Sequence, residues 1–189
     1  MTPSMKTLVR VAFLSAVLSS LAFADERPEV EEGGGSGMRR SGYLLDASSH
    51  ERPMILGIHA IIPYGYYGYG FGIGAGATFY IPLVRDGFIP PLNDEFGLDF
   101  GADLNFFFGY YAPISITIPV SVLWTFHITD KFSAYAKVGI ALKIHPGYVF
   151  PIFPDAVGVV GVNFMLSKGF GLRAEAGYPG FKVGILFAF

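Results

Sequence analysis

The chain has 189 residues, with 13 Lys or Arg and 15 Asp or Glu residues, so its formal net charge is -2 at pH 7. Basic residues this few and scattered cannot neutralise a phosphate backbone, which excludes nucleic acid as a partner. The absence of cysteine excludes a disulfide framework and a lipid-modified N-terminal cysteine. Hydrophobic residues make up 52% of the chain, yet no run of 18 apolar residues follows residue 24, and this favours a membrane β-barrel over membrane helices.

Residues 1–24 have the three parts of a secretory signal peptide. Lys6 and Arg10 precede an apolar run that extends from Val11 to Phe23, and small residues two apart, Ala22 and Ala24, end it. The run is too short for a membrane-spanning helix, which needs about 20 residues. The sequence therefore predicts export with cleavage after Ala24.

Residues 25–53 are polar and rich in glycine and acidic residues, and they include the run Gly33-Gly-Gly-Ser-Gly37. This composition is typical of chains that cannot bury enough apolar surface to fold. The segment is predicted to be a disordered periplasmic leader that acts as a solvated linker, with a tether or a partner-binding tail as the alternatives.

Residues 54–189 contain eight segments in which apolar and polar residues alternate, separated by turn residues. The predicted strands are 56–62, 71–81, 96–108, 114–127, 132–145, 156–166, 170–178 and 181–189. Alternation with period two gives each strand one apolar face and one mixed face. The predicted fold is all-β, an eight-stranded antiparallel up-and-down transmembrane β-barrel.

Two features depart from this pattern. The connection 82–95 is long for a turn, and its Pro90-Pro91 pair is expected to keep it extended and free of strand. Pro119 lies inside the fourth strand, where it cannot donate to the ladder, so a bulge or a local break is expected there.

The charges within the predicted strands share one face, and the opposite face carries none. In a soluble barrel the apolar face would line the interior, so this distribution favours a barrel in lipid with a polar lumen. The predicted lumenal network consists of Asp99, Asp103, Lys137, Lys143, Arg173, Glu175 and Lys182, joined by His59 and His127. Because eight strands enclose a space that side chains fill, the network is expected to form ion pairs.

Four glycines at alternate positions of the second strand, Gly70, Gly72, Gly74 and Gly76, remove the side chains from its lumenal face. The space is either filled by a residue such as Tyr135, Phe107 or Arg173 or holds water. A phosphate-binding loop is not favoured, because no helix follows these glycines.

The chain ends on a strand in which Phe181, Val183, Ile185, Phe187 and Phe189 share one face. With the eight alternating strands and the short turns, this terminus resembles the small outer-membrane β-barrel superfamily that includes OmpA-type and OmpX-type barrels. The resemblance covers residues 54–189 and implies that the terminal residues are the insertion signal read by the barrel assembly machinery. It identifies the architecture and leaves the activity open.

The favoured function is non-enzymatic, a structural or surface-interaction role in the bacterial outer membrane. The first alternative is a narrow pore for ions or small solutes. The second is a lipid-modifying enzyme, for which His145, Asp155 and Ser115 are the candidate residues. No metal-ligand spacing is found and no cofactor is expected.

The expected partners are outer-membrane lipid and, during biogenesis, periplasmic chaperones and the assembly machinery. The aromatic loops 63–69 and 147–154 are interpreted first as an interfacial belt. The alternative is a surface that binds a hydrophobic ligand or another surface protein.

Overall fold

A computed structural model describes residues 42–46, 48–64, 71–108, 114–146 and 152–189. The predicted signal peptide, residues 25–41 of the leader, Gly70 and most of the aromatic loops lie outside these ranges. No helix among the described residues is long and apolar enough to cross a membrane.

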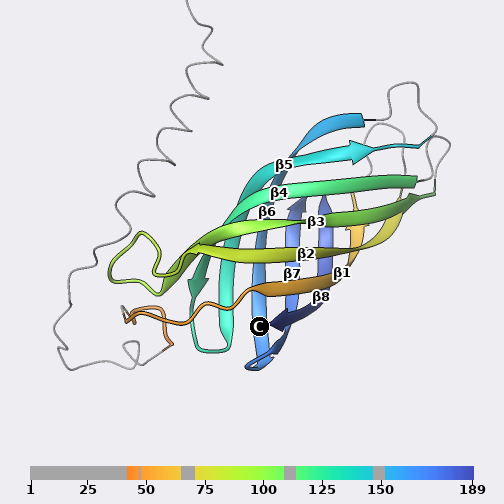
Figure 1. Cartoon of the computed structure of the whole chain (residues 1–189). Coiled ribbons are helices and arrows are strands. Elements are labelled where there is room, and N and C mark those ends of the chain that lie inside the picture. Colours follow the sequence, from red (N-terminus) through yellow and green to blue (C-terminus); the bar gives the residue numbers. More distant parts are fainter. Residues whose placement is uncertain (1–41, 47, 65–70, 109–113, 147–151) are drawn as a thin grey trace, which may run out of the picture.

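Eight antiparallel strands form a closed barrel in which every strand pairs with its neighbours in sequence and β1 pairs with β8 (Figure 1). The strands are β1 Ile55–Pro63, β2 Gly72–Val84, β3 Asp94–Phe107, β4 Ile114–His127, β5 Phe132–Ile144, β6 Ile152–Ser167, β7 Phe170–Tyr178 and β8 Gly180–Ala188. The predicted eight-stranded up-and-down barrel is confirmed. Its architecture is the one that the resemblance to small OmpA-type and OmpX-type barrels implies.

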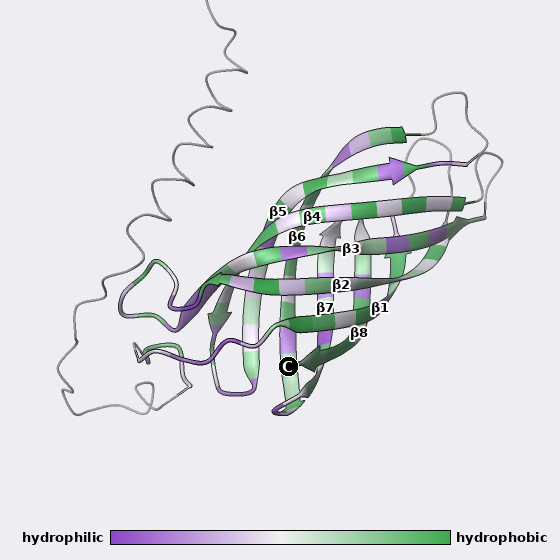
Figure 2. Ribbon diagram, viewed as in Figure 1, coloured by the Kyte–Doolittle hydropathy of each residue, from purple (hydrophilic) through white to green (hydrophobic). Residues whose placement is uncertain are grey.

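Alternate side chains of every strand point away from the barrel, and on each strand large apolar residues among them stay exposed. Ile140 on β5 is 70% exposed and Val160 on β6 is 63% exposed, whereas the inward Leu186 on β8 is 0% exposed. One such outward residue from each strand in turn is Ile58, Ile73, Leu104, Val120, Ile140, Val160, Leu172 and Val183. Hydrophobic and hydrophilic positions alternate along the strands accordingly (Figure 2).

Three strand boundaries differ from the prediction by two or more residues. β2 continues to Val84 and β3 begins at Asp94, so the connection that joins them is shorter than predicted. β6 begins at Ile152, where Ile144 on β5 is its partner. The sequence pattern missed this start because prolines and aromatic residues obscure the alternation there.

Pro119 interrupts one ladder without a bulge. The pairs Phe100↔Val120 and Asp103↔Thr117 keep one register on both sides of it. The β4–β5 ladder continues through it, with Ala141 as its partner. The expected bulge is absent and the expected local break is confined to the ladder with β3, because proline has no N–H to donate.

The last part of the predicted disordered leader, residues 42–46 and 48–53, packs against one end of the barrel, and we call it the strap. The backbone N–H of Asn93 donates to the carbonyl of Leu44 at 2.8 Å. The Arg52 guanidinium lies 3.5 Å from Glu95 and donates to the Arg85 carbonyl at 3.1 Å. The prediction of disorder is therefore wrong for these residues, because they find partners on the β2–β3 connection.

One carboxylate lies on the outward side of the barrel, where the sequence had placed no charge. Asp94 is 0% exposed, and its Oδ2 accepts from the Trp124 indole N–H at 2.8 Å and from the Phe88 backbone N–H at 3.1 Å. The Phe88 ring packs on Phe96 and Trp124, with centroids 5.3 and 6.4 Å away. The β2–β3 connection thus covers a charge that would otherwise face the apolar surroundings, at a position the predicted strand did not reach.

The glycine row on β2 is filled from β3. A Cβ at Gly72 would lie 2.8 Å from the Phe107 ring, and one at Gly74 or Gly76 would collide with Asn105 or Asp103. Phe107, one of the three residues that the sequence suggested could fill the space beside these glycines, occupies part of it. The described glycines therefore allow neighbouring lumenal side chains to approach β2 closely.

We expect Gly76→Ala to destabilise the barrel, because the added methyl would lie 2.5 Å from the Ala102 carbonyl oxygen and would collide with the Asp103 carboxylate. The expected loss is about 1–3 kcal/mol in free energy of unfolding, measured by urea titration in lipid vesicles. The control is Gly158→Ala, because a Cβ at Gly158 meets no atom within 4 Å. Equal stability of the two variants would contradict the filled row.

Candidate functional site

Four charged side chains from three strands meet in the middle of the lumen. Lys137 Nζ lies 2.8 Å from Glu175 Oε1 and 3.5 Å from Asp99 Oδ1. Arg173 lies 3.4 Å from Asp99 and 3.9 Å from Glu175. The Tyr135 hydroxyl donates to Glu175 Oε1 at 2.6 Å. Two bases and two acids therefore neutralise one another.

A second group joins β1, β3 and β8. Asp103 accepts from Lys182 Nζ at 2.7 Å, and its other oxygen lies 2.7 Å from His59 Nε2. Asp103 is 1% exposed and Lys182 is 4% exposed, so this pair is also removed from solvent. Removal of one member of such a pair leaves an uncompensated buried charge, which is strongly destabilising.

Apolar and aromatic groups fill the space between these charges. Tyr80, Leu123 and Tyr135 form a buried cluster, and the Arg173 guanidinium lies 5.2 Å from the centre of the Tyr135 ring. Gly161 gives room to the Tyr135 ring and Gly97 to the Tyr80 ring, because a Cβ at either glycine would collide with that ring. The middle of the lumen is therefore packed.

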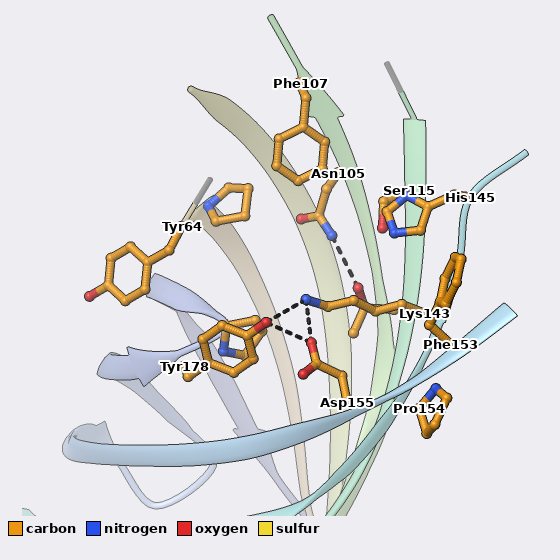
Figure 3. A pocket seen from close by; sticks show the side chains of 13 residues that line it. Tyr64, Asn105, Phe107, Ser115, Lys143, His145, Phe153, Pro154, Asp155 and Tyr178 are labelled. Atoms are coloured by element: carbon orange, nitrogen blue, oxygen red, sulfur yellow. Dashed lines mark hydrogen bonds and ion pairs between the residues drawn. The ribbon is translucent and has the colours of Figure 1, made fainter. Parts of the chain in front are cut away.

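A cavity of about 440 Å³ lies at the end of the barrel opposite the C-terminus (Figure 3). We call this end of the barrel the distal mouth. Its described lining residues are Pro63, Tyr64, Asn105, Phe107, Ser115, Thr117, Lys143, His145, Phe153, Pro154, Asp155, Tyr178 and Pro179. They come from β1 and β7 as well as from β3 to β6. Because closure of the barrel brings β1 near β7, the cavity exists only in the closed barrel.

Three polar groups on one side of the distal mouth bond to one another (Figure 3). Lys143 Nζ lies 2.5 Å from Asp155 Oδ2 and donates to the Tyr178 hydroxyl at 3.1 Å, and that hydroxyl donates to Asp155 Oδ2 at 2.7 Å. Lys143 therefore belongs to the distal mouth, apart from the central charges with which the sequence grouped it. Opposite it, the Asn105 amide donates to Thr117 Oγ1 at 3.4 Å.

The three residues considered for enzymatic chemistry all line the distal mouth. Burial lowers the pKa of His145, which follows the end of β5, and the neighbouring Lys143 charge lowers it further, so both effects favour the neutral imidazole. Its ring lies 5.9 Å from the Phe153 ring. The Asp155 carboxylate is engaged by Lys143 and Tyr178, as described above.

The opposite end of the barrel holds a second cavity of about 420 Å³, lined in part by the strap. His127 Nε2 lies 3.4 Å from Glu95 Oε1, and the other oxygen of this carboxylate faces Arg52. His127 therefore belongs to this end and not to the central network. In the described part of the chain, no group of three or more His, Cys, Asp or Glu side chains is placed to hold a metal ion.

Sequence reasoning missed several residues of the two mouths. Tyr178 has the sequence parity of an outward residue, but its hydroxyl reaches Asp155 after Gly177, whose φ is 150°. Arg52 and Glu95 were assigned to the leader and to a connection. The lumenal face was predicted from strict alternation of inward and outward residues. At strand ends the backbone departs from this alternation, so it does not predict which residues point inward there.

No protein-family model matches the chain, and no curated protein matches it. Among solved structures, the chain is similar to the Yersinia pestis outer membrane protein Ail, determined in a phospholipid bilayer nanodisc. The sequence identity is 12% and the TM-score is 0.46, over 74% of this chain and 100% of Ail. The strand pairing, and not this likeness, carries the assignment of the barrel.

We expect Lys137→Ala to destabilise the barrel by about 3 kcal/mol, because Glu175 and Asp99 would share one remaining base, Arg173, in the packed layer. Lys168→Ala, in an exposed turn, is the control and should change stability by less than about 0.5 kcal/mol. Urea unfolding of both variants in vesicles measures the difference. Equal stabilities would show that the central ion pairs do not support the fold.

Proposed function

We propose that this chain is an integral outer-membrane β-barrel with a structural or surface-interaction role, that it is not an enzyme and that it has no conducting channel. The observation that carries the proposal is the polarity of the barrel wall. Within the described strands, the Asp, Glu, Lys and Arg side chains other than Asp94 occupy inward positions, whereas exposed large apolar side chains surround the outside.

This distribution of inward charges and outward apolar side chains argues against a soluble barrel. A ligand-carrying soluble barrel has an apolar interior and a charged exterior, and contiguous apolar surfaces of this extent are rare on soluble monomers. In lipid the same surface is stable, and barrel closure satisfies the backbone groups that lipid cannot. The predicted secretory signal, in residues 1–24, supports export to that membrane.

The pore alternative is opposed by the packed middle of the lumen. The two mouths hold cavities of about 440 and 420 Å³, but Tyr80, Leu123 and Tyr135 lie between them with the central ion pairs. The glycine row, which suggested a water path, is occupied by Asn105, Asp103 and Phe107. The proposed role is therefore carried by the surfaces of the barrel.

Assembly through the C-terminal strand is part of the proposal. β8 closes the barrel on β1, and the backbone of Phe189 exchanges hydrogen bonds with Met54 at 3.1 and 3.2 Å. Phe181, Val183 and Phe189 are exposed on the outer side, and Phe189 packs at 6.0 Å from Phe79. This terminal face is available to the assembly machinery and to chaperones before closure and to lipid afterwards.

We expect Val138→Arg, in the middle of β5 and 52% exposed, to reduce stability in a bilayer by about 2–4 kcal/mol, because the charge would face hydrocarbon. Ser167→Arg, at the end of β6, should cost no more than about 1 kcal/mol, because it lies near the interface. Heat-dependent gel migration and urea unfolding in vesicles measure the two effects. A Val138→Arg barrel that stays fully stable and soluble without detergent would contradict the membrane proposal.

We expect the folded wild-type barrel to give no steady ionic conductance in a planar bilayer. Large buried side chains of the described strands occupy the narrow lumen, so we expect no continuous water path between these strands. A bilayer that receives only the protein-free detergent solution is the control. Steady conductance that changes in Lys137→Ala or Glu175→Ala would reverse the conclusion in favour of the pore.

A further inference from the structure

The distal mouth has a lining that restricts what can bind in it. Its volume of about 440 Å³ lies within the range of about 300–1,000 Å³ that small-molecule sites occupy. Its described lining includes one cationic side chain, Lys143, one anionic side chain, Asp155, and the imidazole of His145. The Tyr178 hydroxyl is hydrogen-bonded to both Lys143 and Asp155.

The charged side chains of this lining neutralise one another, which disfavours binding of a charged ligand. Lys143 is neutralised by Asp155 at 2.5 Å, and the neutral His145 adds nothing. An anion would compete with Asp155 for Lys143, and a cation would compete with Lys143 for Asp155. Either would have to break an ion pair that is only partly exposed to water, with side-chain exposures of 18% and 23%.

The polar groups oppose a purely apolar ligand. Ser115, Thr117, Asn105 and Tyr178 each carry groups that donate and accept hydrogen bonds. Thr117 Oγ1 already accepts from the Asn105 amide, but Asn105 Oδ1 is buried without a hydrogen-bond partner among the described residues, and an acyl chain seated here would give it none. Buried polar groups without partners are costly.

Flat apolar surfaces complete the lining. The rings of Phe107 and Phe153 and the prolines Pro63, Pro154 and Pro179 border the same space. A ligand that matches the whole lining has apolar faces, a rim of groups that both donate and accept hydrogen bonds, and no net charge. Sugar rings combine C–H faces, which pack on aromatic rings, with a rim of hydroxyls.

We propose that the distal mouth binds a neutral sugar unit, with one ring face against Phe153 and the hydroxyl rim toward Asn105, Ser115 and the Lys143–Asp155–Tyr178 group. This proposal rests on the proposed function, because in an outer-membrane barrel with its C-terminus in the periplasm the distal mouth faces the outside of the cell. The sugar comes either from a free oligosaccharide or from the headgroup of a glycolipid in the same membrane.

The test is saturation-transfer NMR on the folded full chain in phosphatidylcholine nanodiscs, with glucose, galactose, N-acetylglucosamine, maltose and lactose as probes. Binding of at least one of these in the millimolar range or tighter is expected. Glucuronate and glucosamine, which carry a negative and a positive charge, are expected to bind more weakly. Failure of every neutral sugar, or tighter binding of a charged one, overturns the proposal.

Phe153→Ala removes the aromatic face and should weaken binding about tenfold. The matched control is Phe164→Ala on the same strand, where the ring is 45% exposed on the outer side, and it should leave binding unchanged. Equal binding by Phe153→Ala, Phe164→Ala and the wild type places the sugar elsewhere and overturns the proposal.

Asp155→Asn tests the charge argument directly. It leaves Lys143 without its carboxylate, so the preference should change from glucose to glucuronate. An unchanged preference overturns the role assigned to the ion pair and, with it, the selection of neutral sugars. Phe153→Ala provides the independent variant if Asp155→Asn does not fold.

The source of the sugar is separated with nanodiscs that contain lactosylceramide. Loss of the free-lactose signal in these nanodiscs supports the membrane glycolipid as the source, and an unchanged signal supports a free oligosaccharide. Heat-dependent gel migration is recorded for each sample. A barrel that shows the migration shift and binds no sugar overturns only the sugar proposal, whereas absence of the shift contradicts the proposed function.

Discussion

The pairing of β1 with β8 is the contact on which the rest of the structure depends. It joins Ile55 through Pro63 to partners between Gly180 and Ala188, so neither strand is left with an unpaired edge. In lipid an open edge would expose backbone N–H and C=O groups that nothing else could satisfy. Closure also fixes which side chains are enclosed, because alternate residues of each closed strand must point inward.

The enclosed space then determines the chemistry of the interior. Eight strands leave room for side chains and little else, so a charge that points inward must meet its partner directly. Asp99, Glu175, Lys137 and Arg173 do so within 3.9 Å. Glycines such as Gly76 and Gly161 are the complement of these large groups, since they provide the space that the carboxylate of Asp103 and the ring of Tyr135 occupy.

The sequence predicted the regular part of this barrel because period-two alternation extends over many residues of β3, β4 and β5. The same signal separated the lumenal charges from the outer face. It could not predict that Asp94 lies outward and is buried, because its cover is the Phe88 loop, which has no periodicity. Nor could it predict the strap, since the contacts of Arg52 with Arg85 and Glu95 join segments whose composition suggests only turns and linkers.

The distal mouth follows from the unequal lengths of the strands. β3, β4, β5 and β6 have 14, 14, 13 and 16 residues, whereas β1, β7 and β8 have 9 each. The β6–β7 pairing ends at Gly158 and Tyr178, but β6 begins at Ile152, so Phe153 and Asp155 lie on an extension of the taller wall. A barrel with a level rim would pair these residues with β7 as well as with β5. The uneven rim instead leaves them facing a cavity, close enough to Tyr178 for Asp155 to bond to it across the opening.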